Sequence, residues 1–507
     1  MKKNRQIILH PFLFGIYPVI ALLAYNIEEI QAKAALRSLL IAFLGTVLIF
    51  TFLKLWLRDW HKAAFVSSLF VGLFFSYGHI YNFLEATPIL GITFGRHRIL
   101  GPLWLGLFVL GLWWIVKKAG NLQQVSHYLN IIAALLLIFP LAQLGLFGYR
   151  TLSVSSQEHT AQAANVELHL PEDHPAPDIY YIILDAYSRD DMLKKNYNID
   201  NTPFLDELRN MGFYIGDCSQ SNYAQTELSL ASSLNSNYLD ALDKRFTAGN
   251  TSRVGLPELI QHSATRQALE SLGYSTVAFE TGFDATQIED ASLYLSGSKS
   301  QGINDFENLL IRTTAGRIFS EGIAFLNLKP DWEARDEAHR QQILFTLSEL
   351  QKMPAVPGPK FVFAHLVIPH WPHVFGPNGE PVHEHPDSVT GYRDQVLFIN
   401  KQIVPILNKI ISESKSPPII IVQGDHGSVI EAPQRRMSIL NVYYLPYGGE
   451  QKLYEQISPV NSFRVILDYY FGDNLPLLKD TSYYSIYDEP YNYQIIQNER
   501  PGCQVNP

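Results

Sequence analysis

The sequence predicts two parts with different folds: a bundle of five membrane-spanning helices over residues 1–150, and an α/β domain with a mostly parallel sheet over residues 178–472. Five long apolar runs crowd the first part, whereas short aliphatic runs alternate with helical patterns in the second. Charge divides the chain at the same place. Residues 1–150 hold 13 Lys and Arg against 4 Asp and Glu, a balance of +9, and the remainder holds 26 against 44, a balance of −18. The two parts are therefore suited to different surroundings.

Each apolar run is close to the roughly 20 residues that a helix needs to cross a hydrocarbon layer about 30 Å thick. The alternative, buried helices of a soluble core, would require one domain to bury five such runs within 150 residues. None of the runs contains Asp, Glu, Lys or Arg, whereas transport pathways need ionisable groups inside the membrane. We therefore expect an anchor rather than a transporter. The five runs are Ile7–Tyr25, Ser38–Leu53, Ala63–Leu84, Ile99–Val116 and Val125–Tyr149.

Basic residues in the connecting loops predict which way the bundle faces. Eight lie before the first run, between the second and third, or after the fourth, and four lie in the alternate loops. The positive-inside rule then places the N-terminus inside, so five spans put the chain after Arg150 outside. We expect a multi-pass protein of the inner or plasma membrane with an extracytoplasmic domain. The eight are Lys2, Lys3, Arg5, Lys54, Arg58, Lys62, Lys117 and Lys118, and the four are Lys33, Arg37, Arg96 and Arg98.

The chain beyond the bundle reads as a linker, an α/β domain and a tail. Residues 151–177 are polar, have no period and end in Pro-rich sequence, which is typical of a linker. Residues 473–507 are expected to form a C-terminal tail. Within the domain, strands are expected near 179–185, 274–280, 360–366, 418–423 and 439–446, and helices near 201–212, 226–239, 265–273 and 389–414.

Polar residues follow two of the expected strands. Asp185 closes "IYYIILD", and Asp425 and His426 follow "PIIIVQG" within the stretch "QGDHG". The carboxyl ends of parallel strands are where open α/β sheets bind ligands, and Gly427 is expected to let the backbone turn sharply there. Thr226 begins a helix whose N-terminal amides favour an anion.

Two carboxylates, an imidazole and a hydroxyl form a ligand set for a divalent cation. Zn²⁺ or Mn²⁺ is expected first, and Mg²⁺ or Ca²⁺ is the alternative. Each residue also has a purely structural explanation. Asp185 could cap the next turn, Thr226 could be an ordinary N-cap, and the Asp–His pair could be a cap and a loop histidine. The combination favours a site more than any single member does.

Histidines form a further cluster in "FVFAHLVIPHWPHVFGPNG", residues 361–379. His365 closes an expected strand, and His370 and His373 lie in a loop that prolines stiffen. Such histidines could bind phosphate or sulfate oxygens or protonate a leaving group, and the alternative is that they are surface residues of the loop. The two cysteines, Cys218 and Cys503, could pair, but they cannot form a disulfide framework.

The order of these motifs resembles the alkaline phosphatase and sulfatase superfamily, in particular its membrane-anchored branch, which includes lipoteichoic acid synthases and phosphoethanolamine transferases. The resemblance spans about residues 178–472 and rests on "YYIILDAYSR", "NTPFLDEL", "SNYAQTELSLASSLN", "HLVIPHWPH" and "QGDHG". It implies a sulfatase-like α/β fold and a metal held by Asp185, Thr226, Asp425 and His426, with Thr226 as the nucleophile.

The same resemblance implies that His370 contacts a substrate oxygen, with His365 and His373 beside it. Typical sulfatases convert a Cys or Ser in a C/S-x-P-S-R motif to formylglycine, whereas the aligned stretch here is "TELSL", with no Cys, Pro or Arg. A full second set of metal ligands is also missing from the sequence. We therefore expect a membrane-anchored, metal-dependent phosphotransferase or phosphodiesterase that acts on a phospho-headgroup or phosphate ester through Thr226.

Two alternatives remain at this point. One is a sulfatase-like hydrolase of sulfate or phosphate esters, and the other is a non-catalytic membrane-anchored binding protein. The expected partners are the lipid bilayer and a membrane lipid or a phosphate or sulfate ester, and the sequence carries no signal of oligomeric state. Nucleic acid is not expected, because the part after residue 150 carries a balance of −18 and phosphate backbones require a basic surface.

Overall fold

The chain folds into two compact units. The computed structural model describes residues 7–27, 30, 32–87, 95–155, 168–171, 174–297, 305–320, 331–382, 387–428 and 433–503. One unit comprises residues 1–159 and 301–334, and the other comprises residues 160–300 and 335–507. Each unit is described by itself. Residues 156–167 and 172–173 of the expected linker lie outside the described residues.

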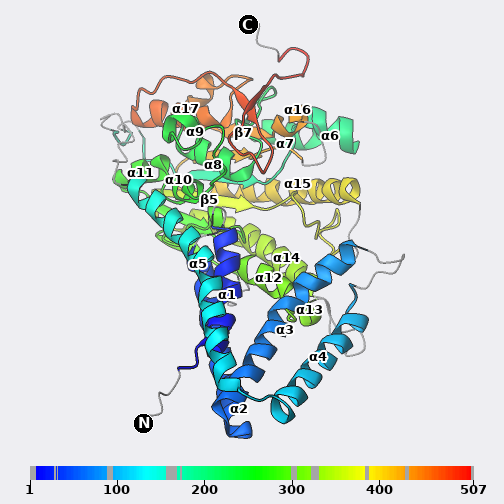
Figure 1. Cartoon of the computed structure of the whole chain (residues 1–507). Coiled ribbons are helices and arrows are strands. Elements are labelled where there is room, and N and C mark those ends of the chain that lie inside the picture. Colours follow the sequence, from blue (N-terminus) through cyan, green and yellow to red (C-terminus); the bar gives the residue numbers. More distant parts are fainter. Residues whose placement is uncertain are drawn as a thin grey trace. The chain divides into compact units, whose positions relative to one another are not determined.

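The first unit is built from long apolar helices (Figure 1). Large apolar side chains such as Leu48, Phe52 and Phe139 are exposed on them, as lipid-facing helices require. Within the described residues, four of these helices have the length and composition to cross a membrane. The elements are α1 (His10–Tyr25), η1 (Ala32–Ala35), α2 (Leu36–Leu57), α3 (Trp60–Ala86), α4 (His97–Lys117) and α5 (Leu122–Ser155).

Helix α1 is shorter than the apolar run that predicted it. Its 16 residues span about 24 Å at 1.5 Å per residue. The side chain of Asn130 in α5 explains where α1 begins, because its oxygen accepts from the backbone N–H groups of Leu9 and His10, at 3.0 and 2.8 Å. The expected five-helix arrangement is confirmed, with four long helices and one short one.

The second unit contains a seven-stranded, mostly parallel sheet in the order β2-β7-β6-β1-β5-β3-β4. Strand β1 lies at its centre and runs parallel to both β5 and β6, while β7 is antiparallel to β6 and to β2. The expected mostly parallel sheet is confirmed. The strands are β1 (Ile179–Leu184), β2 (Tyr214–Ile215), β3 (Ser275–Phe279), β4 (Leu293–Leu295), β5 (Lys360–Leu366), β6 (Ile419–Gln423) and β7 (Asn441–Tyr444).

Both faces of the sheet are covered by helices. Alternate residues of β1 enter two separate cores: Ile182 and its neighbours two residues away pack with one set of helices, and Ile183 and its neighbours two residues away pack with the other. All six residues of β1 are buried, which is why its sequence is a continuous apolar run. On the first side lie α6 (Asp190–Tyr197), α7 (Thr202–Asn210), α14 (Asp331–Leu350) and α15 (Ser388–Glu413); on the second lie α8 (Thr226–Leu234), α10 (Gly255–Gln261), α11 (Ala264–Ser271) and α17 (Pro459–Phe471).

The remaining elements are short, and those near the C-terminus belong to the α/β unit. Strands β8 (Ser482–Tyr484) and β9 (Gln494–Ile496) pair in an antiparallel hairpin. A disulfide joins Cys218 to Cys503, with the two Cα atoms 5.3 Å apart. The described residues also form α9 (Leu239–Leu242), η2 (Asp284–Thr286), α12 (Asp305–Thr313), α13 (Arg317–Ser320), η4 (Met353–Ala355), α16 (Pro433–Met437) and η5 (Gly449–Lys452).

Candidate active site

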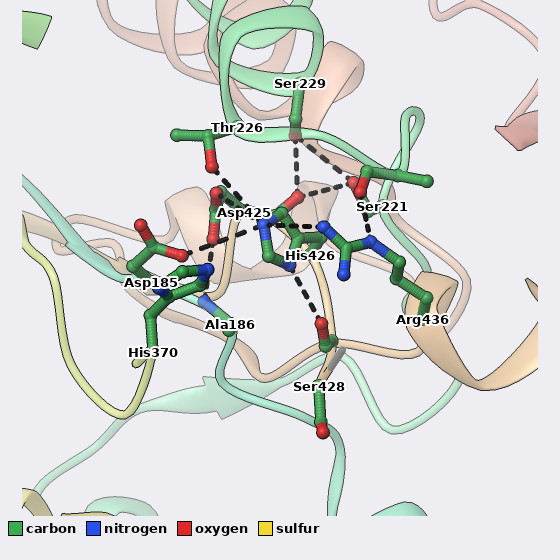
Figure 2. A network of polar contacts seen from close by, with 12 residues as sticks. Asp185, Ala186, Ser221, Thr226, Ser229, His370, Asp425, His426, Ser428 and Arg436 are labelled. Carbon is green, nitrogen blue, oxygen red and sulfur yellow. Dashed lines mark hydrogen bonds and ion pairs between the residues drawn. The ribbon is translucent and has the colours of Figure 1, made fainter. Parts of the chain in front are cut away.

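Three neighbouring strands deliver the polar residues of the site to one edge of the sheet. Strand β1 ends immediately before Asp185, β6 ends just before the segment that carries Asp425 and His426, and β5 contains His365 near its end. Because β1 lies between β5 and β6 and is parallel to both, the carboxyl ends of the three strands meet. Figure 2 shows the side chains of Asp185, Asp425 and His426 close to one another.

Two carboxylates and an imidazole present acceptor atoms to one another. The Nε2 atom of His426 lies 3.5 Å from Asp425 Oδ2 and 3.7 Å from Asp185 Oδ1. Both carboxylate oxygens are buried and have no hydrogen-bond partner among the described residues. Ligand atoms of these three residues lie within 4.8 Å of one another. Buried, unsatisfied oxygens that face a nitrogen lone pair fit a divalent cation, because an ion would compensate the cost of burying them.

The tautomer of His426 leaves Nε2 free to bind a ligand. Its Nδ1 lies 2.8 Å from the carbonyl oxygen of Gly427, and since a carbonyl only accepts, Nδ1 carries the hydrogen. Burial lowers the pKa of His426, and the nearby charge of Arg436 lowers it further, while the two carboxylates oppose the shift. The neutral imidazole, which is the form that binds metals, is thereby favoured.

Asp185 is held as a carboxylate by the histidines around it. Burial alone would raise its pKa, but the charge of His370, together with the hydrogen bond and charge of His365, keeps the pKa well below its usual range. The bond joins His365 Nε2 to Asp185 Oδ2 at 3.2 Å, and His365 Nδ1 lies 3.0 Å from the Thr286 hydroxyl. His365 is therefore placed to orient Asp185.

The backbone around Asp425 is fixed from several directions. Asp425 Oδ1 accepts from the backbone N–H of Ala186 at 3.0 Å, and Ala186 itself adopts a φ of 63°, which is uncommon for a residue other than Gly. The hydroxyls of Ser221 and Ser229 both donate to the Asp425 carbonyl oxygen, at 2.6 and 2.7 Å. These contacts leave Asp425 Oδ2 as the oxygen that faces His426.

Gly427 is required here for a different reason from the one expected. The sequence suggested a sharp turn, but a Cβ at Gly427 would lie 2.8 Å from the carbonyl oxygen of Arg435 and 2.9 Å from that of Ser438. A Cβ added at Gly424 would similarly collide with the backbone of Tyr187. The glycines of "QGDHG" therefore permit close backbone packing beside the site.

Thr226 is the first residue of α8, and its hydroxyl reaches the same atom of His426. The distance from Thr226 Oγ1 to His426 Nε2 is 3.3 Å. Gln225, not Thr226, occupies the N-cap position. The Thr226 side chain therefore points toward the acidic group instead of capping the helix, which removes the main structural explanation for a Thr at this position.

The loop histidines divide into one beside the site and one packed elsewhere. The ring of His370 lies 6.2 Å from that of His426, and its backbone N–H donates to the Asp185 carbonyl oxygen at 3.1 Å. His370 Nδ1 donates to the carbonyl oxygen of Trp371 at 2.7 Å, so its Nε2 is the remaining ring nitrogen. His373 is buried, and its ring lies against Gly391 of α15.

Comparison with known proteins identifies the family of the chain. Residues 177–463 match the family described as Sulfatase, which is more than half of the chain. The chain belongs to the sulfatase family. No curated protein matches the sequence at a significant level.

Several solved structures resemble this sulfatase-family chain at low identity. The C-terminal periplasmic domain of EcEptC from Escherichia coli is 14% identical, covers 66% of this chain and 94% of its own, and has a TM-score of 0.41. The lipooligosaccharide phosphoethanolamine transferase A (EptA) from Neisseria meningitidis, an integral membrane protein, is 13% identical, with coverages of 91% and 96% and a TM-score of 0.39. The lipoteichoic acid synthase LtaP from Listeria monocytogenes is 12% identical, with coverages of 62% and 80% and a TM-score of 0.36.

A buried arginine beside Thr226 was missed from the sequence. Arg253 donates from Nη1 to Glu227 Oε2 at 3.0 Å and from Nη2 to Gln225 Oε1, so one guanidinium holds the residues on both sides of Thr226. Arg253 Nη2 also donates to the Tyr487 carbonyl oxygen at 2.9 Å, and the guanidinium lies over the Tyr487 ring at 4.2 Å. No short motif marks this residue.

A second missed arginine, Arg436, lies on α16 at the edge of this sulfatase-family site (Figure 2). Its Nη2 is 3.4 Å from His426 Nε2, and its Nε donates to the Ala224 carbonyl oxygen at 2.5 Å. The "QRRM" sequence around it resembles an exposed basic turn, so only the fold brings this cation to the acidic group. A cation here can meet an anionic ligand.

Proposed function

We propose that the protein is a membrane-anchored, metal-dependent phosphotransferase or phosphodiesterase that uses Thr226 as its nucleophile. The observation that carries this proposal is the Thr226 hydroxyl 3.3 Å from His426 Nε2, beside the unsatisfied carboxylate oxygens of Asp185 and Asp425. An isolated hydroxyl is a weak nucleophile, and the imidazole and the two carboxylates beside it would activate it.

Asp185, Thr226, Asp425 and His426 would hold the divalent ion. Oxygen and imidazole ligands suit Zn²⁺ or Mn²⁺, and Mg²⁺ or Ca²⁺ remains the alternative for so oxygen-rich a set. When bound, such an ion lowers the pKa of a coordinated hydroxyl and offsets charge that develops on phosphoryl oxygens. The chain's own contribution is to keep His426 neutral and Asp185 ionised before the ion arrives.

The proposed reaction has two displacements at phosphorus. In the first, the Thr226 hydroxyl would pass its proton to His370 Nε2, a bond forms between Oγ1 and phosphorus, and the bond from phosphorus to the leaving alcohol breaks. His370, through Nε2, is placed to give that alcohol a proton. In the second, the oxygen of an acceptor alcohol or of water bonds to phosphorus and gives its proton to His370 Nε2, the bond from phosphorus to Thr226 Oγ1 breaks, and that proton returns to Oγ1.

Arg436 would bind the negative oxygens of the phosphate ester during both steps. The Arg436 guanidinium and the Thr226 hydroxyl both contact His426 Nε2. A fork of N–H donors matches phosphate oxygens and strengthens as they gain charge in the transition state. The site thus supplies a cation beyond the four metal ligands.

Membership of the sulfatase family does not by itself make the substrate a sulfate ester. Conversion to formylglycine requires a Cys or Ser, whereas the hydroxyl that contacts His426 belongs to Thr226. A sulfate or phosphate ester hydrolase is the second candidate, because water could serve as the acceptor in the same site.

We also propose that the α/β unit lies on the extracytoplasmic side of the inner or plasma membrane. We propose that it acts there on a lipid-linked phosphate ester. Two features support this location. Apolar helices of membrane-spanning length precede the domain, and the disulfide between Cys218 and Cys503 is of a kind that persists in oxidising compartments.

The experiment that tests the proposed function compares two threonines that both begin helices. Full-length protein is incubated with its metal and with either phospholipid vesicles, a soluble phosphodiester or a sulfate ester. The wild type should show a phosphoryl or phospho-alcohol adduct on Thr226 by mass spectrometry, and Thr226→Ala should lose both adduct and turnover. Thr202→Ala, at the first position of α7, should retain both. Normal turnover by Thr226→Ala, or cleavage of sulfate esters alone, would refute the transferase proposal.

A further inference from the structure

A segment inside the α/β sequence packs with the membrane helices instead. The chain leaves the second unit after β4, contributes residues 301–334 to the first unit, and then returns for α14 and β5. Of this segment the structure describes residues 305–320, which contain α12 and α13 (Figure 1), and residues 331–334, which begin α14. The two units are consequently joined by three crossings of the chain rather than one.

The first contact of this segment is with α1, η1 and the start of α2. Phe306 is fully buried in a small core with Val19 and Ala35. Beside it, Glu307 accepts two hydrogen bonds from Arg37, one of them from Nε to Oε1 at 2.5 Å, and only 7% of Glu307 is exposed. Arg37 is partly exposed, whereas Glu307 is buried, and the bidentate ion pair between them fixes Glu307 in position.

The second contact is with one face of α3 near its end. An added Cβ at Gly78 would collide with the backbone of Arg312 and Thr313, and the backbone N–H of Ala315 donates to the Phe74 carbonyl oxygen at 2.8 Å. The absent side chain of Gly78 therefore lets two backbones touch.

Arg317 completes this second contact. Its guanidinium lies 4.0 Å from the Tyr81 ring, donates to the Asn82 side-chain oxygen, and is 3.6 Å from Glu85 Oε2. Only 6% of Arg317 is exposed. Residues 74, 78, 81, 82 and 85 recur at helical spacing, so they make one continuous face of α3.

Both contacts lie at the same end of the helical bundle. Consecutive spans alternate in direction, so the start of α2, the end of α3 and the end of α5 share one side of the membrane. The chain departs for the α/β unit after α5. The packed segment therefore lies at the end of the bundle from which the chain departs after α5.

The connections that flank the segment are short. Leu295 at the end of β4 and Asp305 at the start of α12 are ten residues apart, which an extended chain spans in at most about 35 Å. Ser320 and Asp331 are eleven residues apart, with a limit of about 39 Å. These lengths are the longest reach of the chain on either side of the packed segment.

We propose that residues 305–320 are a docking segment, which holds the α/β unit to the membrane helices independently of the linker after α5. We further propose that turnover of a substrate within the bilayer requires this docking, whereas turnover of a water-soluble ester does not; this second part rests on the proposed function. The partner of the docking segment is the surface formed by Val19, Ala35, Arg37 and the face of α3 from Phe74 to Glu85.

Cleavage of the linker tests the docking without using activity. A specific protease site is inserted between Ser155 and Leu168 of the full-length protein, the protein is placed in membranes, and the site is cut. The released fragment contains the docking segment, so it should stay with the membranes in the wild type. Glu307→Arg should raise the fraction in the supernatant by at least roughly tenfold, because it places a second positive charge against Arg37 at a buried position beside Phe306. The reciprocal pair Arg37→Glu with Glu307→Arg should restore retention.

Two further variants make this result specific. Gly78→Leu should release the fragment through the second contact, since its side chain cannot fit against the Arg312 backbone. Arg209→Glu, which changes an exposed ion pair of α7, should leave retention unchanged. Release of the wild-type fragment, or equal retention of all variants, would overturn the docking proposal.

The second part is tested on uncut protein with two probes, phosphatidylethanolamine vesicles and bis(4-nitrophenyl) phosphate. Glu307→Arg should reduce turnover of the vesicle lipid by at least roughly tenfold and leave turnover of the soluble diester within about twofold, since the loss is one of positioning. Equal effects on both probes would overturn this part. If the wild type turns over neither probe, the proposed function fails, while the cleavage experiment still decides the docking.

Discussion

The Thr226 hydroxyl and the Nε2 atom of His426 lie 3.3 Å apart although 200 residues separate them in the sequence. One begins α8, and the other follows β6, on the edge of the sheet where β1 also ends. The relationship depends on each side chain pointing toward the other, because Thr226 is not a helix cap and His426 donates its only ring hydrogen to Gly427. It accounts for an Asp–His pair at the end of so apolar a strand.

We predict that Asp425→Asn abolishes metal binding. The substitution keeps the shape of Asp425 and removes the charge of the buried oxygen that faces His426. The purified full-length wild type should contain about one divalent ion per chain, and the variant almost none, because incomplete sites bind weakly. Metal analysis measures the content, and removing the ion should lower the melting temperature of the wild type, since an ion at 100 times its Kd contributes about 2.7 kcal/mol. Asp206→Asn, an exposed change on α7, is the control; full metal content in Asp425→Asn would contradict the assignment.

We predict that Arg253→Lys slows the chemical step. A lysine carries a single compact ammonium group, so it cannot bind Gln225 and Glu227 at the same time as the planar guanidinium does. Thr226 lies between these two residues, and a displacement of its hydroxyl by about 1 Å can cost around 100-fold in rate. Steady-state kinetics should show a lower kcat with little change in KM and an unchanged metal content. Arg245→Lys, which alters a nearby pair with Asp243, should behave as the wild type.

The sequence was sufficient to predict the anchor, the sheet and the main polar residues, because each leaves a local pattern. Lipid-exposed helices and fully buried parallel strands such as β6 are continuous apolar runs, and strand ends can be read directly after them. Arg253, in the segment before α10, and Arg436, on α16, could not be found in this way, since only long-range packing brings them to the site. The short length of α1 could not be predicted from the sequence either, because it depends on Asn130 of another helix. The sequence of residues 305–320 could not reveal that they pack with the membrane helices, because it shows only a short helix of nine residues with mixed polar and apolar side chains.

We predict that Arg436→Gln impairs use of the phosphate ester while sparing the metal. The guanidinium lies 3.4 Å from His426 Nε2, where it can bind phosphate oxygens but repels a cation. The value of kcat/KM should fall by roughly 100-fold, as for the loss of one donor that stabilises a transition state. Metal affinity should stay equal or rise, which distinguishes this variant from Asp425→Asn. Arg435→Gln, whose side chain contacts Asn196, serves as the matched control; a loss of metal from Arg436→Gln would argue for a structural role instead.

We predict that breaking the disulfide destabilises the α/β unit. Cys218 and Cys503 are 285 residues apart in sequence, and removing a native disulfide typically costs about 2–5 kcal/mol. Cys218→Ser and Cys503→Ser should each lower the melting temperature, and the double variant should be no worse than either single one, because one bond is lost in all three. Proteolysis should also reach the region of β8 and β9 sooner. Additive effects of the two substitutions would show that the cysteines do not pair.

We predict that the α/β unit is extracytoplasmic. Eight basic residues lie in loops on one side of the bundle and four on the other, which orients the chain after α5 outward. A reporter that functions only outside the cytoplasm should be active when fused after His159. The same reporter fused between α4 and α5, after Gly120, should be inactive. The reverse pattern would place the whole α/β unit in the cytoplasm.

The interrupted path of the chain bears on how the α/β unit could be produced without its membrane helices. A continuous stretch from residue 160 to 507 would include α12, whose Phe306 side chain is fully buried in a core with Val19 and Ala35. In water that apolar surface and the buried carboxylate of Glu307 would lack their partners, which favours aggregation. A soluble enzyme is better assembled from two separate stretches, 160–300 and 335–507, joined by a short polar connection in place of residues 301–334.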